Sequence, residues 1–167
     1  MPLNKLKAFL DRNEIKYESI LHPLAYTAQG VAAIAHIPGK ELAKTVIVNV
    51  DGILAMAVLP ASTHVDTGWL KTAIGARELK VATEQEFKDA FPDCEVGAMP
   101  PFGNLYGMTV YVDESLTRDV EIVFNAGSHR DLIRLSYADF DRTVNPVVLS
   151  FARERATRTG GWAWAER

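Results

Sequence analysis

The chain has 167 residues, 48% of them hydrophobic, with a formal net charge of −3 and a single cysteine. This length and composition predict one globular domain with a hydrophobic core, and the slight negative charge excludes a protein that coats duplex nucleic acid, although it permits contact with one end of a nucleic acid. The lone Cys94 rules out an internal disulfide, and no apolar run approaches the ~20 residues of a membrane span. We therefore expect a soluble cytoplasmic protein with no membrane partner.

The first half of the chain has the hydrophobic periodicity of two helices, a strand and a hairpin. A helix is predicted over residues 3–12, a strand over 17–21, and an alanine-rich helix over 28–36 with Thr27 as its N-cap. Apolar runs at 44–50 and 53–59 are separated by Asp51-Gly52, a strong hairpin signal. Their nearly continuous apolar character predicts two central strands that are buried on both faces.

The second half of the chain predicts three more helices and three more strands. The helices are predicted over 66–75, from a capping box at 83–86 to Pro92, and over 137–144 with Ser136 as the N-cap. The strands are predicted over 109–112, 120–125 and 132–135. Mixed helices and strands with hairpin-type connections favour an α+β fold. Residues 156–167, which contain Trp162 and Trp164, are interpreted as a C-terminal extension that follows a domain of residues 1–155.

Residues 97–103 read Gly-Ala-Met-Pro-Pro-Phe-Gly and form the most informative stretch of the chain. Glycine permits positive φ and close approach to a ligand, whereas proline fixes φ and removes a donor. The segment is therefore predicted to be a rigid loop whose remaining N–H groups point in fixed directions. Because it contains no acid, base or nucleophile, it is either a buried turn or a surface that polarises a substrate through its backbone.

Lys44 and His129 are the two other candidates for chemistry. Lys44 begins an apolar strand and shares a face with Val46 and Val48, so its ammonium either extends to solvent or holds a phosphate or carboxyl group at the edge of the sheet. His129 follows Gly127-Ser128 at a break between two strands, where it is either an exposed turn residue or a ligand contact. Ser128 and His129 do not form a convincing nucleophile–base pair, because adjacent residues point apart and no orienting acid is evident.

Other chemistries find little support in the sequence. The four histidines lack the spacing of metal ligands, Cys94 has no partner cysteine, and no phosphate-binding glycine pattern is present. We therefore expect neither a metal nor a cofactor. Cys94 is predicted to be a small core residue. Asp93 and Glu95, which flank it, are either a pair of acids or part of a solvated helix end.

Five segments carry a resemblance to a known family. They are HPLAYTAQGVA at 22–32, AKTVIVNVDG at 43–52, AVLPA at 57–61, VGAMPPFGNLYGMTVYVDESL at 96–116 and IVFNAGSHRDLIRLSYADF at 122–140. In this order they resemble the YbaK/prolyl-tRNA-synthetase editing-domain family of aminoacyl-tRNA deacylases, over about residues 1–150. The resemblance implies a single α+β domain with a mixed, mostly antiparallel sheet flanked by helices.

The activity that the resemblance implies is hydrolysis of the ester between a wrong amino acid and the 3′-terminal adenosine of a tRNA, with no metal and no covalent intermediate. A vicinal ribose hydroxyl of the substrate is thought to help activate water. Lys44 matches the lysine of the family and would fix the terminal phosphate or ribose, while His129 would touch the aminoacyl group. Gly97 through Pro101 match its G-x-x-x-P loop, whose amides around Ala98 and Met99 would receive the oxyanion. The implied catalytic residues are Lys44, Gly97, Ala98, Met99 and Pro101, and the implied substrate-binding residues are Tyr26, Thr27, Thr45, Phe102, Gly127, Ser128 and His129.

The amino acid and the partners are less closely defined. Alanine, cysteine, serine and threonine esters all fit, and alanine or cysteine on tRNA(Pro) is the expected substrate, although Met99 and Pro100 depart from the smaller or polar residues that many members carry there. The acceptor end of tRNA is the expected partner, with an aminoacyl-tRNA synthetase or elongation factor supplying a basic surface. Two alternatives remain open: a non-catalytic module that binds aminoacyl-tRNA or an amino acid, and a scaffold subunit whose C-terminal tail docks a partner.

Overall fold

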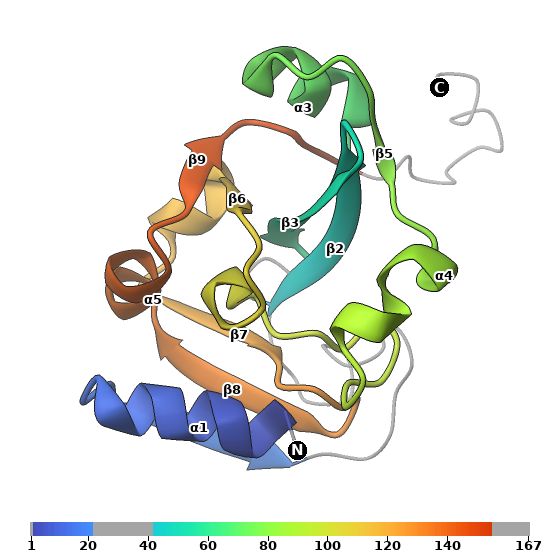
Figure 1. Cartoon of the computed structure of the whole chain (residues 1–167). Helices are drawn as coiled ribbons and strands as arrows, with labels where there is room; N and C mark the ends of the chain where they lie inside the picture. The colour runs from blue at the N-terminus through green and yellow to red at the C-terminus, as the bar shows by residue number, and fades with distance from the viewer. Residues whose placement is uncertain (1, 22–41, 155–167) are drawn as a thin grey trace, which may run out of the picture.

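The computed structural model describes residues 2–21 and 42–154, which form a mixed sheet of eight strands with helices packed around it (Figure 1). The helices are α1 (Pro2–Arg12), α3 (Thr67–Ile74), α4 (Glu84–Phe87) and α5 (Tyr137–Val144), with short 3₁₀ helices η1 (Lys88–Ala90), η2 (Gly103–Leu105) and η3 (Glu114–Arg118). The strands are β1 (Tyr17–Leu21), β2 (Leu42–Val50), β3 (Ile53–Pro60), β4 (Thr63–Val65), β5 (Leu79–Val81), β6 (Val110–Asp113), β7 (Glu121–Asn125), β8 (Asp131–Ser136), β9 (Val147–Leu149) and β10 (Ala152–Glu154).

The strand order in the sheet is β1-β8-β7-β2-β3-β6-β9, and β5 pairs with β2 outside this path. Strand β2 runs parallel to β7, and β6 runs parallel to both β3 and β9, while the remaining pairs are antiparallel. Strands β4 and β10 form a separate antiparallel pair. The predicted α+β fold with a mixed, mostly antiparallel sheet flanked by helices is confirmed.

The β2–β3 hairpin lies in the middle of the sheet, as the sequence predicts. Asp51 and Gly52 have φ values of 51° and 90°, and two positive φ angles are what a two-residue type I′ turn requires. Along β3, Met56 and Val58 pack into one hydrophobic cluster, whereas Ala57 and its alternate neighbours pack into a second cluster on the other face. The prediction that this pair is buried on both faces is confirmed.

The larger cluster is centred on Phe102, which is fully buried. Its ring lies 5.9 Å from that of Phe9, 5.4 Å from Phe124 and 5.6 Å from Phe140, with the mostly tilted or edge-on geometry that aromatic pairs prefer. Helix α1 adds Leu6 and Leu10 to this cluster. The second cluster lies under α3 and β10, on the opposite face of the central strands.

The predicted helix ends are confirmed where they can be observed. The carboxylate of Asp66 accepts the N–H of Trp69 at the start of α3, and Gly75 ends this helix with a φ of 70°. Thr83 and Glu86 form the expected capping box of α4, and Ser136 caps α5. Helix α4 is shorter than predicted, because it gives way to a 3₁₀ turn at Lys88 well before Pro92.

Four strands of three residues each, β4, β5, β9 and β10, were not predicted from the sequence. Because β10 pairs with β4, the folded domain extends at least to Glu154. The boundary at residue 155 stays a prediction, and the expected helix over 28–36 and the extension over 156–167 lie outside the described residues. None of the helices in the described ranges combines the length and apolarity needed to cross a membrane.

Candidate functional site

The sheet opens along one edge of β2. Strand β2 pairs with β7 only through Leu42 and Ala43, and with β5 only through Val48–Val50, whereas β3 covers its other edge throughout. Between these two contacts, the described structure pairs no strand with this edge of β2. The open stretch begins at Lys44, and the expected contact of its ammonium with a phosphate or carboxyl group stays a prediction.

The register of β2 and β7 decides which side chains meet at this opening. Ala43 pairs with Phe124, so continuing the parallel register sets Lys44 opposite Asn125, and Thr45 opposite Ala126. Opposite residues on neighbouring strands project from the same face of a sheet. Lys44, which is half-buried, therefore shares a face with Asn125, while Thr45 lies on the face of the larger cluster.

Two buried polar atoms flank this opening without a partner. The hydroxyl of Thr45 (9% exposed) and the side-chain oxygen of Asn125 (6% exposed) make no hydrogen bond within the described structure. A buried polar group left unsatisfied costs about 1–3 kcal/mol, so such groups call for an explanation. Both atoms are suited to binding polar groups of a ligand. Asn125 was not a sequence candidate, and its only signal is a polar residue that ends a strand after three apolar residues.

Four hydrogen bonds join the glycine–proline loop to the corner after β7; we call this set, formed by Glu95, Val96, Ala98, Gly127 and His129, the cross-loop lock. The Glu95 N–H donates to the Gly127 carbonyl at 2.9 Å, and the Gly127 N–H donates to the Ala98 carbonyl at 2.8 Å. The His129 N–H donates to a carboxylate oxygen of Glu95 at 2.7 Å. Finally, Nε2 of His129 lies 2.7 Å from the Val96 carbonyl. The lock brings together two segments that the sequence proposed separately.

The backbone of Gly97 lies directly against His129. Gly97 has a φ of 85°, and a Cβ at this position would lie 3.5 Å from Cε1 of the imidazole. Only glycine adopts this left-handed conformation without strain. The sequence therefore predicted the need for a glycine correctly, and the structure shows what the glycine faces.

The loop amides are not equally available to a substrate. The Ala98 N–H, which was expected to receive an oxyanion, already donates to the Glu95 carbonyl at 3.0 Å. The N–H groups of Gly97 and Met99 have no acceptor among the described residues. The side chains of Ala98 and Met99 are buried, so the loop offers a substrate mainly its backbone.

His129 is not an exposed turn residue, because only 6% of it is accessible. A carbonyl oxygen can only accept, so the contact with Val96 requires Nε2 of His129 to carry a proton and donate it. The imidazole thereby supports the loop that carries Gly97. Its expected contact with the aminoacyl group stays a prediction.

The remaining sequence candidates fall into three groups. The Ser128 hydroxyl donates to the Asp131 carboxylate at 2.7 Å and accepts two backbone N–H groups, so it is part of the turn. Phe102 was expected to contact substrate, but its complete burial in the core leaves no surface for that contact. Pro101 is buried beside it. Tyr26 and Thr27 lie outside the described residues.

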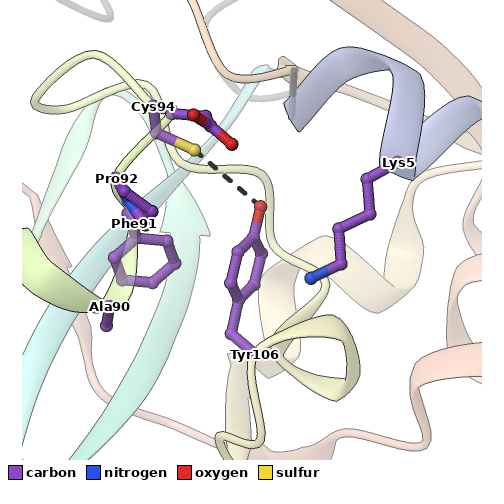
Figure 2. Close-up of a pocket in the computed structure, with 7 residues that line it drawn as sticks. Lys5, Ala90, Phe91, Pro92, Cys94 and Tyr106 are labelled. Carbon is purple, nitrogen blue, oxygen red and sulfur yellow. Dashed lines mark hydrogen bonds between the residues drawn. The ribbon is translucent and has the colours of Figure 1, made fainter.

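A cavity of about 220 Å³ is lined by Cys94, Tyr106 and Lys5 among others, and by no residue of the glycine–proline loop (Figure 2). The sulfur of Cys94 lies 3.8 Å from the Tyr106 hydroxyl, and the Lys5 ammonium lies 4.8 Å from the centre of the Tyr106 ring. Burial raises the pKa of the Cys94 thiol and also that of the Tyr106 phenol, so both groups are uncharged near pH 7. A neutral thiol is a poor nucleophile, and Cys94 packs against the larger cluster as expected.

Metal-ligating side chains do not gather anywhere in the described part of the chain, since no three His, Cys, Asp or Glu residues there form a cluster suited to an ion. The polar groups that the described structure places at the opening of the sheet are Lys44, Thr45, Asn125 and the backbone of the glycine–proline loop.

Comparison with known proteins gives consistent results. A family model described as "Aminoacyl-tRNA editing domain" matches residues 22–143. The multifunctional Ser/Thr-tRNA deacylase ProXp-y of Escherichia coli (strain K12) is 27% identical over 154 residues, which cover 89% of this chain and 92% of that protein. The proline–tRNA ligase of Bacillus mycoides is 25% identical over 113 residues, which cover 68% of this chain and 18% of the ligase.

Two solved structures show the same fold. The crystal structure of hypothetical protein APE2540 superimposes with a TM-score of 0.81 at 18% identity and covers 89% of this chain and 99% of its own. A candidate trans-editing enzyme for prolyl-tRNA synthetase superimposes with a TM-score of 0.77 at 18% identity and covers 91% of this chain and 97% of its own.

Proposed function

The chain belongs to the aminoacyl-tRNA editing domain family, and on this basis we propose that it hydrolyses the ester bond of mischarged tRNA as a free-standing enzyme. The resemblance to the YbaK/prolyl-tRNA-synthetase editing domains that the sequence suggested is thereby confirmed. The similarity to ProXp-y, which spans nearly the whole of both proteins, supports an enzyme that acts in trans rather than as part of a synthetase.

The observation that carries the mechanism is the position of Gly97, whose backbone is held against His129 and whose N–H has no acceptor within the described residues. In ester hydrolysis, water adds to the carbonyl carbon, the carbonyl oxygen becomes an oxyanion, and the ribose oxygen then leaves with a proton. We assign the oxyanion to the N–H groups of Gly97 and Met99. One such donor in a preorganised site is worth about 3–4 kcal/mol of transition-state stabilisation.

Lys44 is assigned to the terminal phosphate or ribose of the tRNA. It stands where β2 loses its partner β7, so its ammonium can reach a ligand at the edge of the sheet. The side-chain oxygen of Asn125, on the same face of the sheet as Lys44, is buried without a partner in the described structure and is suited to accept a hydrogen bond from a hydroxyl group of the ribose. The hydroxyl of Thr45, which projects from the other face and also lacks a described partner, is assigned to another polar group of the substrate. Holding the ester and the attacking water in the reactive geometry lowers the activation barrier by several kcal/mol, so no protein nucleophile is required.

For the amino acid, we propose a small side chain. The sequence allows alanine, cysteine, serine and threonine and favours alanine or cysteine on tRNA(Pro), whereas the name of ProXp-y supports serine and threonine as substrates to be tested. The acceptor end of tRNA is the proposed partner, with a synthetase or elongation factor supplying additional basic surface. A cytoplasmic location follows from such a substrate and stays a prediction.

The proposal is tested with a panel of tRNAs charged with alanine, cysteine, serine, threonine and proline. Each is incubated with the full chain, and the loss of the aminoacyl group is compared with spontaneous hydrolysis. We expect accelerated release of at least one small amino acid, while correctly charged prolyl-tRNA(Pro) is spared because its larger ring is excluded. If every ester is bound but none is hydrolysed, the chain is a binding module and the proposed function is wrong.

A further inference from the structure

We propose that Glu95 is a positioning residue of the deacylase site, which acts by holding the cross-loop lock closed; this inference rests on the proposed function. From the sequence, Glu95 was either one of a pair of acids with Asp93 or part of a solvated helix end. In the structure its carboxylate instead reaches a backbone N–H group 34 residues away, that of His129, at 2.7 Å. The length is that of a charge-assisted hydrogen bond, the stronger class of such bonds.

Glu95 holds the corner after β7 at two points. Its carboxylate accepts the N–H of His129, and its own N–H donates to the carbonyl of Gly127. The three-residue corner 127–129 is thus hydrogen-bonded at both ends to one residue, which restrains its backbone relative to the glycine–proline loop. Only the contact with His129 uses the side chain, so truncation of Glu95 removes that contact and keeps the backbone hydrogen bond to Gly127.

The imidazole of His129 in turn connects the corner to the segment that carries Gly97. Nε2 of His129 lies 2.7 Å from the carbonyl of Val96, and the ring edge faces Gly97. The chain of contacts therefore runs from the Glu95 carboxylate through the His129 backbone and ring to the peptide that carries the Gly97 N–H. That N–H is one of the two donors assigned to the oxyanion, so loss of the Glu95 carboxylate displaces the donor while leaving it chemically intact.

Glu95 is exposed to solvent, so an effect of its removal on catalysis can be distinguished from an effect on the packing of the core. Glu95, Val96 and Gly97 are all exposed, whereas the core side chains of Ala98 and Met99 are buried. Truncation of Glu95 therefore removes no core packing. The expected effect is on the rate of the chemical step, for which a displacement of about 1 Å can cost on the order of 10²-fold.

The test compares Glu95→Ala with Glu95→Gln, which keeps an oxygen acceptor, and with Asp93→Ala, which removes the same charge from the same segment. Asp93 makes no hydrogen bond within the described chain and so serves as the control for charge. We expect Glu95→Ala to lower kcat by about 10- to 100-fold with a much smaller change in KM. Glu95→Gln is expected to recover most of this loss, and Asp93→Ala to match the unmodified chain.

A second readout, hydrogen exchange at the His129 amide, reports on the lock without any substrate. We expect faster exchange in Glu95→Ala and not in Asp93→Ala. The proposal is overturned if Glu95→Ala keeps its kcat, if Glu95→Gln is as impaired as Glu95→Ala, or if the His129 amide exchanges at the same rate in all variants. If the unmodified chain hydrolyses no ester, the proposed function fails, and the exchange measurement still decides whether Glu95 holds the lock.

Discussion

The imidazole of His129 lies against the backbone of Gly97, 3.5 Å from the point that a Cβ on this glycine would occupy. One residue comes from the glycine–proline loop and the other from the corner after β7, and each had been a separate candidate in the sequence. Their contact makes the two segments one structural unit and gives a first means of testing what that unit does.

Substitution of Gly97 by alanine is expected to impair both stability and catalysis. At a φ of 85° an L-residue is strained by about 1–2 kcal/mol, and relief of that strain moves the Gly97 N–H away from its present position. Gly107→Ala is the matched control, since Gly107 has a φ of 68° and a Cβ there would meet no atom within 4 Å. Urea denaturation should show a similar loss of stability in both variants, and deacylation assays a loss only in Gly97→Ala. Equal activity in the two variants would remove Gly97 from the site.

Thr45→Val is expected to separate stability from function. The Thr45 hydroxyl is buried without a partner in the described structure, so its removal should leave the free energy of unfolding unchanged or raise it by about 1 kcal/mol. The value of kcat/KM should fall, because we assign this hydroxyl to the substrate. In the control Thr63→Val, a hydroxyl that donates to the Pro60 carbonyl at 2.7 Å is lost, so stability should fall and activity remain. A Thr45→Val protein that is less stable but fully active would contradict the assignment.

Cys94→Ala is expected to keep full deacylase activity. Burial raises the pKa of the Cys94 thiol, so little thiolate is present near pH 7, and the proposed mechanism uses no covalent intermediate. Alkylation of the folded protein by iodoacetamide should be slow at pH 7 and should accelerate only at pH values above the ordinary thiol pKa. Rapid alkylation that abolishes hydrolysis would instead indicate a cysteine nucleophile.

Asp113 is expected to make the fold sensitive to acid. Burial alone would raise the pKa of Asp113, but hydrogen bonds from Ser115, Phe151 and Ala152 outweigh it and hold the pKa below its ordinary value. A carboxylate with a lowered folded-state pKa stabilises the protein above its unfolded-state pKa of about 3.9, and this contribution is lost as the pH falls through the folded-state value.

The free energy of unfolding should be measured from about pH 6 down to about pH 2, a range that spans the ordinary carboxyl pKa. As the pH falls, it should decrease more steeply for the unmodified chain than for Asp113→Asn. At pH 6 the variant should be less stable by about 2–3 kcal/mol, since it weakens hydrogen bonds to a charged group. The exposed Asp89→Asn serves as the control and should follow the unmodified chain. Identical pH profiles for Asp113→Asn and the unmodified chain would contradict the role of these hydrogen bonds.

The elements that could be predicted from the sequence are those whose signals are local. The hairpin follows from Asp51-Gly52 between two apolar runs, and the helix ends follow from caps such as Ser136 and Gly75. Strands β4, β5, β9 and β10 could not be predicted, because three residues are too few to show an alternating pattern. Such strands exist only through their pairing with distant segments.

The residues of the candidate site also differ in whether they carry a local sequence signal. Lys44, Gly97 and His129 stand out locally, as a charge on an apolar strand, a glycine in a rigid loop and a histidine at a strand break. Glu95 could not be singled out, because its partner is 34 residues away and a surface acid carries no pattern. Phe102 was assigned to substrate because it lies in the loop sequence, whereas its ring packs against Phe124 in the core.

The most direct test of the account is the single-turnover rate at which the full chain and Lys44→Ala hydrolyse the best mischarged tRNA from the panel. We expect rapid hydrolysis by the unmodified chain and a loss on the order of 10²-fold or more in Lys44→Ala, with an unchanged melting temperature and with the exposed Lys88→Ala as an active control. Hydrolysis by Lys44→Ala within a few-fold of the unmodified rate would contradict the assignment of Lys44, and the absence of hydrolysis by the unmodified chain would contradict the central claim itself.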